Sequence, residues 1–182
     1  MGKGKKSFLF MLISTVVLAL SQGISFGQVE TTPLQFLKQQ EMKHREIRGE
    51  VYLGNVLTLN YPAYSEEAPA KYHALLLELT DVLQTPLRKS YRLVLKGYTD
   101  SRGSADINLK LSRQRGEKLK GMLIKKYYMP KERITFEGHG ADNQVASNAT
   151  AEGRRQNRRV EIHVYGDVSQ AVRFIETEEE TK

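Results

Sequence analysis

An arginine stands inside the apolar stripe of the longest predicted helix, and this charge constrains the fold more than any other feature. Residues 107–127 follow helical periodicity at roughly 100° per residue. The apolar residues of this helix share one face: Leu111, Leu119, Met122, Leu123 and Tyr127. Arg115 lies on the same face, with Asn108 before it. A charge that faces the core is costly unless it is paired. We therefore expect a carboxylate partner, from the protein or from a ligand, and the nearest protein candidate is Asp100.

The first 27 residues have the organisation of an export signal. A positive start with three lysines is followed by a mostly apolar run at residues 8–20, and Ser25-Phe26-Gly27 places small residues at the cleavage positions. The apolar run is short for a membrane span, which needs about 20 residues. We expect cleavage before Gln28, with an uncleaved anchor as the alternative. Loss of the three lysines lowers the formal charge from +7 to +4, so the basic pI says little about partners.

The rest of the chain divides into three parts. Residues 28–50 form a polar lead-in, which is either a short helix or a flexible segment. Residues 51–166 alternate between strand and helix patterns and are the expected domain. Residues 167–182 end in an acidic run that is typical of a disordered tail. No cysteine is present, which excludes disulfides, thiol catalysis, a lipidated cysteine and cysteine-based metal sites.

Hydrophobic periodicity predicts the order β-α-β-α-β-β for the domain. Alternation of apolar residues predicts strands, and three- to four-residue spacing predicts helices. The expected strands are 51–59, 91–98, 134–137 and 159–165, and the expected helices are 72–83 and 107–127. A long polar loop is expected at 138–151. This order indicates an α/β (α+β) domain of two layers, in which the helices pack on one mixed sheet.

Three segments carry the residues with chemical potential. Residues 97–103 connect a strand to a helix, where Asp100 can cap backbone N–H groups and Gly103 supplies a permissive turn. Residues 108–115 open the helix that carries Arg115. Residues 154–162 are rich in arginine and lead into the last strand.

At these segments the chain resembles the OmpA-like peptidoglycan-binding domain, over roughly residues 51–165. The family pattern has Thr-Asp with a glycine three positions later, then Asn-x-x-Leu-Ser-x-x-Arg, a Gly-x-Gly turn, and Asn-Arg-Arg-Val-Glu. The matching residues are Thr99, Asp100, Gly103, Asn108, Leu111, Ser112, Arg115, Gly138, Gly140 and 157–162. Three departures stand out. Tyr98 replaces histidine, Gly116 replaces alanine, and Leu59-Asn60-Tyr61 replaces the Phe-Asp-Ser that walls the family's pocket.

The resemblance implies non-catalytic binding of peptidoglycan, with no metal and no cofactor. It assigns Asp100 and Arg115 to the diaminopimelate of the peptide stem. A carboxylate suits the ligand's ammonium, and an arginine fork suits its carboxylate. The further ligand contacts that it implies are Thr99, Asn108, Leu111 and Arg158. The loop-bracing residues that it implies are Gly103, Asn148 and Asn157.

Several alternatives stay open at this stage. Asp100 and Arg115 are equally consistent with an internal salt bridge, and Asn108 with bracing of the loop backbone. A wall-acting enzyme would pair Asp100 with Glu137, but no nucleophile–base pair or metal set accompanies them. The chain is alternatively a partner-binding module that has lost wall binding. Nucleic-acid binding is opposed by the export signal and by the lack of interleaved aromatic residues.

The expected location follows from the signal and the resemblance together. We expect a protein of the periplasm or cell envelope that binds peptidoglycan, with association with the outer membrane as an option. It acts alone or bridges the wall to an envelope protein partner.

Overall fold

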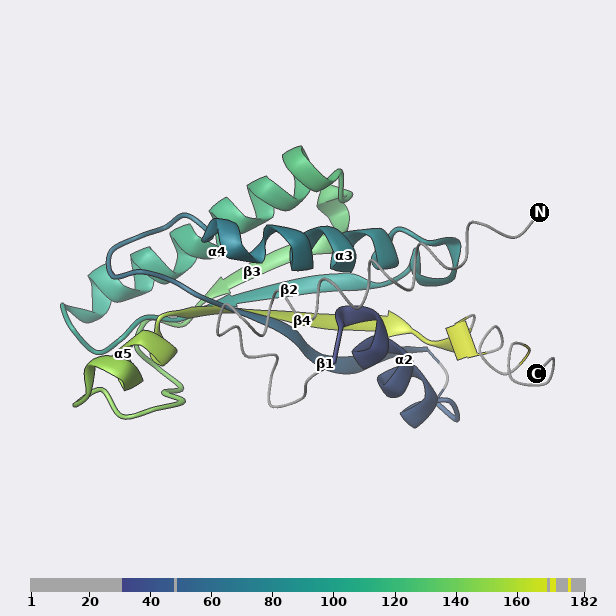
Figure 1. Cartoon of the computed structure of the whole chain (residues 1–182), viewed down its shortest axis with the longest axis horizontal. Helices are drawn as coiled ribbons and strands as arrows, with labels where there is room; N and C mark the ends of the chain where they lie inside the picture. Colours follow the sequence, from purple (N-terminus) through teal and green to yellow (C-terminus); the bar gives the residue numbers. More distant parts are fainter. Residues whose placement is uncertain (1–30, 48, 170, 173–176, 178–182) are drawn as a thin grey trace.

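A four-stranded mixed sheet organises the domain. Across the sheet the strands are β1 (Glu50–Asn60), β4 (Arg159–Asp167), β2 (Arg92–Gly97) and β3 (Ile134–Gly138). β4 is antiparallel to both β1 and β2, whereas β2 and β3 are parallel. The carboxyl ends of β1, β2 and β3 therefore meet the beginning of β4 at one end of the sheet, which is shown in Figure 1.

The computed structural model describes residues 31–47, 49–169, 171–172 and 177. The predicted export signal at residues 1–27 lies outside the described residues. So does the acidic run at 176–182, apart from Thr177. Within the part of the chain that is described, no helix combines the length and the hydropathy that crossing a membrane requires.

The main helices form a layer on the sheet. α4 (Ala105–Tyr127) lies against β2 and β3, and α3 (His73–Leu83) lies beside α4. α2 (Pro33–Lys43) packs against β1 and α3. The shorter helical segments are η1 (Ala70–Tyr72), η2 (Pro86–Arg88), η3 (Lys131–Arg133) and α5 (Ala151–Asn157). The predicted two-layer arrangement of helices on one mixed sheet is confirmed.

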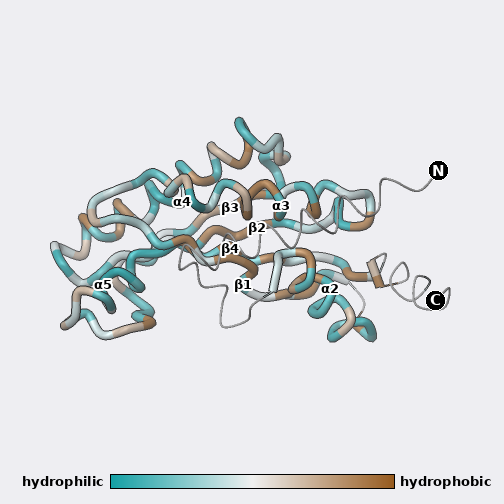
Figure 2. Tube along the Cα trace, viewed as in Figure 1, coloured by the Kyte–Doolittle hydropathy of each residue, from teal (hydrophilic) through white to brown (hydrophobic). Residues whose placement is uncertain are grey.

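The core lies between the sheet and this layer. Alternate residues of the two central strands, Leu93 and Leu95 on β2 and Val160, Ile162 and Val164 on β4, are fully buried. Burial of each apolar side chain of this kind adds about 1.5–3 kcal/mol to the free energy of unfolding. Figure 2 shows the apolar residues concentrated along the strands, while α5 and its loop are mostly hydrophilic.

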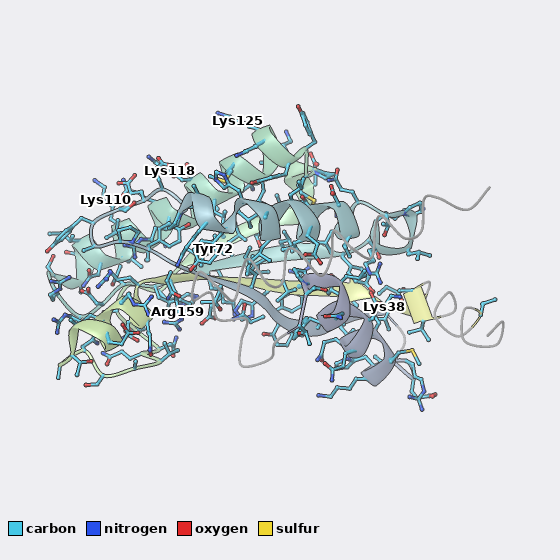
Figure 3. All side chains as sticks on the ribbon, viewed as in Figure 1. Lys38, Tyr72, Lys110, Lys118, Lys125 and Arg159 are labelled. Atoms are coloured by element: carbon cyan, nitrogen blue, oxygen red, sulfur yellow. The ribbon has the colours of Figure 1, made fainter. Side chains whose placement is uncertain are left out.

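Two glycines let α4 lie unusually close to the strand ends. A Cβ added to Gly97 would stand 2.2 Å from the Ser112 carbonyl oxygen, and one added to Gly138 would stand 2.4 Å from Arg113 Cγ. The Ser112 hydroxyl also accepts a hydrogen bond from Gly140 N at 3.0 Å. The opposite face of α4 is solvated as predicted, and Figure 3 shows Lys110, Lys118 and Lys125 along its outer side.

Among the described residues two α-helices, α2 and α5, lie outside the predicted order. For the lead-in, where a helix and a flexible segment were both open, the structure has α2. Its start is a capping box in which Thr32 and Gln35 satisfy each other's backbone N–H groups. α5 lies at the end of the predicted polar loop, capped by Thr150. Seven residues that include a glycine are too few to show helical periodicity.

A buried ion pair ties α2 to the domain. Arg88 Nε and Nη2 donate to the two Glu41 carboxylate oxygens at 2.6 and 2.8 Å, and the Tyr91 hydroxyl donates to Glu41 Oε1 at 2.8 Å. Glu41 is fully buried, and Leu37 of the same helix belongs to the core. α2 is therefore packed as an integral part of the fold.

We predict that Glu41→Gln lowers the free energy of unfolding by about 3 kcal/mol, because removing one partner leaves the Arg88 charge buried without compensation. Urea denaturation monitored by circular dichroism measures the change. Glu46→Gln is the matched control, since Glu46 forms an exposed pair with Arg45 and should change stability by less than about 0.5 kcal/mol. Equal stability of Glu41→Gln and wild type would contradict a structural role for the pair.

Candidate ligand-binding site

Three chain segments converge at the end of the sheet where β1 and β2 finish and β4 begins. Tyr61 N donates to the Arg158 carbonyl and Tyr98 N to the Arg159 carbonyl, both at 2.8 Å. Thr99 N donates to the Gly140 carbonyl at 2.7 Å. The strand pairing thus continues beyond the sheet and brings residues distant in sequence to one place.

The Arg115 guanidinium links these segments by donating hydrogen bonds to three backbone carbonyls. Its Nε donates to the Ser65 carbonyl at 2.8 Å, its Nη1 to the Tyr98 carbonyl at 2.8 Å, and its Nη2 to the Pro62 carbonyl at 3.3 Å. The side chain is 0% exposed. One residue of α4 therefore fixes both the end of β2 and the loop that follows β1.

Arg115 is a buried cation that also rests on an aromatic ring. Its guanidinium carbon lies 5.1 Å from the centre of the Tyr61 ring, within the range of a cation–π contact. Burial lowers the Arg115 pKa to about 10. The group still carries its charge at neutral pH, so the site contains a permanent cation.

The internal salt bridge between Asp100 and Arg115, open at the level of sequence, is not formed among the described residues. Arg115 uses backbone carbonyls instead of a protein carboxylate. Carbonyl oxygens accept from a buried guanidinium without bringing a second charge into the interior, which avoids one desolvation cost. Of the two partners expected for Arg115, a protein carboxylate or a ligand carboxylate, the ligand carboxylate is the one still open.

Asp100 is paired with two other arginines. Arg158 Nη1 donates to Asp100 Oδ2 at 2.8 Å, and Arg102 Nη2 donates to the same oxygen at 3.0 Å. Burial raises the Asp100 pKa, but the hydrogen bonds from Arg102 and Arg158 outweigh burial and hold this pKa below its usual value. Asp100 is therefore an ionised carboxylate at neutral pH.

A small cavity of about 20 Å³ opens between these groups. Its lining contains all six residues that the resemblance assigns to ligand contact: Thr99, Asp100, Asn108, Leu111, Arg115 and Arg158. Asn108 is buried at the wall of this cavity. The cavity has room for about one water molecule.

Three further residues line the cavity that sequence reasoning missed: Ala63, Tyr64 and Arg102. Tyr64 adopts a φ of 58°, a left-handed conformation that is uncommon for a bulky residue, and its ring is mostly exposed. The only available signal was its place in a turn after Pro62. Arg102 follows Asp100 by two positions, and this spacing could have indicated a contact with the Asp100 carboxylate.

The corner at Leu59-Asn60-Tyr61, which departs from the family's pocket wall in sequence, does not line the cavity. Leu59 is fully buried in the core, and Asn60 Nδ2 donates to the carbonyls of Arg155 and Gln156 at 3.4 and 3.3 Å. Tyr61 supports the site from behind. Its ring lies against Arg115, and its carbonyl accepts from Arg158 Nε at 3.1 Å.

The residues predicted to brace the loops, Asn157 and Asn148, form hydrogen bonds with the polar loop and with the loop after β2. Asn157 Oδ1 accepts from the backbone N–H groups of Val145 and Ala146 at 2.9 and 3.1 Å. Its Nδ2 donates to Asn148 Oδ1 at 3.0 Å, and that oxygen also accepts from Ser101 N at 3.2 Å. Gly103 adopts a φ of 92°, which favours glycine.

The carboxylates imagined for an enzyme do not share this cavity. Asp100 lines it, whereas Glu137 lies on β3 and contacts His139 at 3.1 Å. Tyr98, where the family has histidine, stacks on His139 with ring centres 5.0 Å apart and faces Arg159 on its other side. Among the described residues no cluster of acidic and histidine side chains is arranged to hold a metal ion.

Comparison with known proteins matches residues 65–158 to the model of the OmpA family. The chain is 50% identical over 66 residues to "Probable lipoprotein YiaD" of Escherichia coli, a match that covers 36% of this chain and 30% of that protein. It is 45% identical over 73 residues to "Peptidoglycan-binding protein ArfA" of Mycobacterium tuberculosis, covering 40% of this chain and 22% of the relative. The chain therefore spans less than a third of the length of these two relatives.

A solved structure supports the same fold. The cell wall anchor of the T6SS from Pseudomonas aeruginosa aligns with a TM-score of 0.52 and 28% identity. The alignment covers 73% of this chain and 96% of that structure.

We predict that Arg115→Lys lowers the free energy of unfolding by about 2–4 kcal/mol. A single ammonium cannot reach all three carbonyls, and each buried carbonyl left without a donor costs about 1–3 kcal/mol. Urea denaturation measures this loss. Arg113→Lys, two residues earlier on the exposed face of α4, is the control and should stay within about 0.5 kcal/mol of wild type. An Arg115→Lys protein as stable as the control would show that the carbonyl contacts contribute little.

Proposed function

This chain belongs to the OmpA family, and we propose that it binds peptidoglycan through the diaminopimelate of the peptide stem without catalysing a reaction. The names of its relatives support wall binding. One mycobacterial relative is called a peptidoglycan-binding protein, and one structural neighbour is a cell wall anchor. The residues around the cavity support the choice of ligand group.

The observation that carries this proposal is an unsatisfied hydroxyl at the cavity. Thr99 is 3% exposed and lines the cavity, and its Oγ1 has no hydrogen-bond partner among the described residues. A buried hydroxyl without a partner costs about 1–3 kcal/mol. A ligand that enters beside Asp100 and Arg115 would supply the missing partner.

The charges of the site match the end of diaminopimelate, where one carbon carries an ammonium and a carboxylate. Asp100 provides an ionised carboxylate for the ammonium. Arg115 has five N–H groups and uses three of them on carbonyls, which leaves two for a ligand carboxylate. Arg158, which is mostly buried beside Asp100, adds a second cation for the same carboxylate.

Anchoring in the cell envelope follows as part of the proposal. The export signal at residues 1–27 would bring the chain to the periplasm, where the wall lies. α2 is fixed to the domain by Glu41 and Arg88. A partner attached before α2 would then be held at a defined position relative to the wall. The domain would act as an anchor or a bridge.

Thr99→Val tests the proposal more cleanly than a change at Asp100, because Asp100 also holds Arg158. We predict that Thr99→Val leaves the free energy of unfolding unchanged or raises it by up to about 1 kcal/mol, since it removes an unpaired buried hydroxyl. The affinity for a diaminopimelate-containing muropeptide, measured by isothermal titration calorimetry, should fall about five- to tenfold, the equivalent of about 1–1.4 kcal/mol.

Thr135→Val is the matched control, since Thr135 is exposed on β3 away from the cavity. It should leave the affinity unchanged. If a folded Thr99→Val protein binds the muropeptide as tightly as wild type does, the ligand does not use this cavity.

A further inference from the structure

The Asp100 carboxylate has no room for another donor in the structure. Its Oδ1 accepts from Arg102 N at 3.1 Å and from Arg102 Nε at 3.3 Å. Its Oδ2 accepts from Arg102 Nη2 at 3.0 Å and from Arg158 Nη1 at 2.8 Å. A carboxylate accepts about four hydrogen bonds, so a ligand ammonium can reach Asp100 only by replacing one of these donors.

The two arginines are held very differently. Arg158 has a side chain that is 14% exposed, and its Nε is also bound to the Tyr61 carbonyl at 3.1 Å. The Arg102 side chain is 48% exposed, and among the described residues all its hydrogen bonds go to Asp100. Its guanidinium carbon also lies 6.0 Å from the centre of the exposed Tyr64 ring. Arg102 is therefore the donor that can leave.

The cavity dimensions agree with this difference. Arg102 forms part of the cavity wall together with Ala63 and Tyr64, and the space that they leave is about 20 Å³. One water molecule fills such a space, whereas an amino-acid head group is several times larger. Movement of the exposed Arg102 side chain toward solvent would both enlarge the cavity and free Asp100 oxygens.

We infer, on the basis of the proposed function, that Arg102 is a specificity-determining residue. Its guanidinium occupies the position on Asp100 that the ligand's ammonium takes when the ligand binds. Binding then exchanges one cation for another. Asp100 stays paired in both states, so the carboxylate is never left without a cation near Arg115 and Arg158. The exchange also selects among ligands, because a ligand without an ammonium cannot replace the Arg102 side chain on Asp100.

The inference is tested by pairing two proteins with two ligands. Wild type and Arg102→Ala are titrated calorimetrically with a muropeptide whose stem carries diaminopimelate, and with the same muropeptide lacking the side-chain amine. We expect Arg102→Ala to bind the first ligand about two- to fivefold more tightly, on the scale of one exposed ion pair. The affinity for the second ligand should not change. The difference between the two ligands then measures the effect of Arg102 on the binding of the ammonium alone.

Arg155→Ala is the control, since Arg155 also forms an exposed two-point pair, with Glu152 on α5, away from the cavity. It should bind both ligands as wild type does. Equal or weaker binding of the first ligand by a folded Arg102→Ala protein, with wild type binding it, overturns the exchange alone. Binding of that ligand by neither protein overturns the proposed function itself.

Discussion

A single buried guanidinium organises the end of this domain that contains the cavity. Arg115 satisfies the carbonyls of Ser65, Tyr98 and Pro62 and thereby joins a helix, the end of a strand and a loop. Removing any of these contacts would leave a polar group buried without a partner, which is among the most costly changes in a protein interior. The cavity is therefore built around a charge that the fold itself needs, and in the proposed function the same side chain offers its remaining N–H groups to a ligand. In the proposed function the structural and binding roles would coincide in one side chain, so a substitution of Arg115 is a poor test of binding alone.

The electrostatic balance of the cavity supports a ligand with both signs of charge. Three guanidiniums, those of Arg102, Arg115 and Arg158, surround one carboxylate. Only Arg102 is largely exposed, and it occupies the carboxylate that a ligand ammonium would use. An amino-acid head group would bring its own cation to Asp100 and its anion to the arginines that stay. In the proposed exchange, Asp100 would be paired with a cation both before and after binding. An unpaired buried charge, which costs several kcal/mol and is large relative to the stability of an ordinary domain, would be avoided.

Much of this architecture is predictable from periodicity and spacing, and the rest depends on contacts that periodicity does not encode. The apolar alternation of β2 and β4 predicts the sheet, and the arginine in the stripe of α4 predicts the position of the cavity. The partners of Arg115 could not be predicted, because backbone carbonyls leave no signature in a sequence. Leu59 and Asn60 depart from the residues that wall the family's pocket, and the sequence did not show where they would point. Their side chains turn to the core and to α5. Tyr64 and Arg102 lie in turns, where a residue's direction depends on local dihedral angles and not on a repeating pattern.

The most direct test of the central claim is a crystal structure of the full chain with a diaminopimelate-containing muropeptide. The account predicts that a ligand carboxylate lies within about 2.7–3.2 Å of Arg115 Nη1 and Nη2, that Thr99 Oγ1 gains a partner, and that the three carbonyl contacts of Arg115 persist. A muropeptide bound elsewhere on the surface, with the environment of Arg115 unchanged and Thr99 Oγ1 still unpaired, would contradict it.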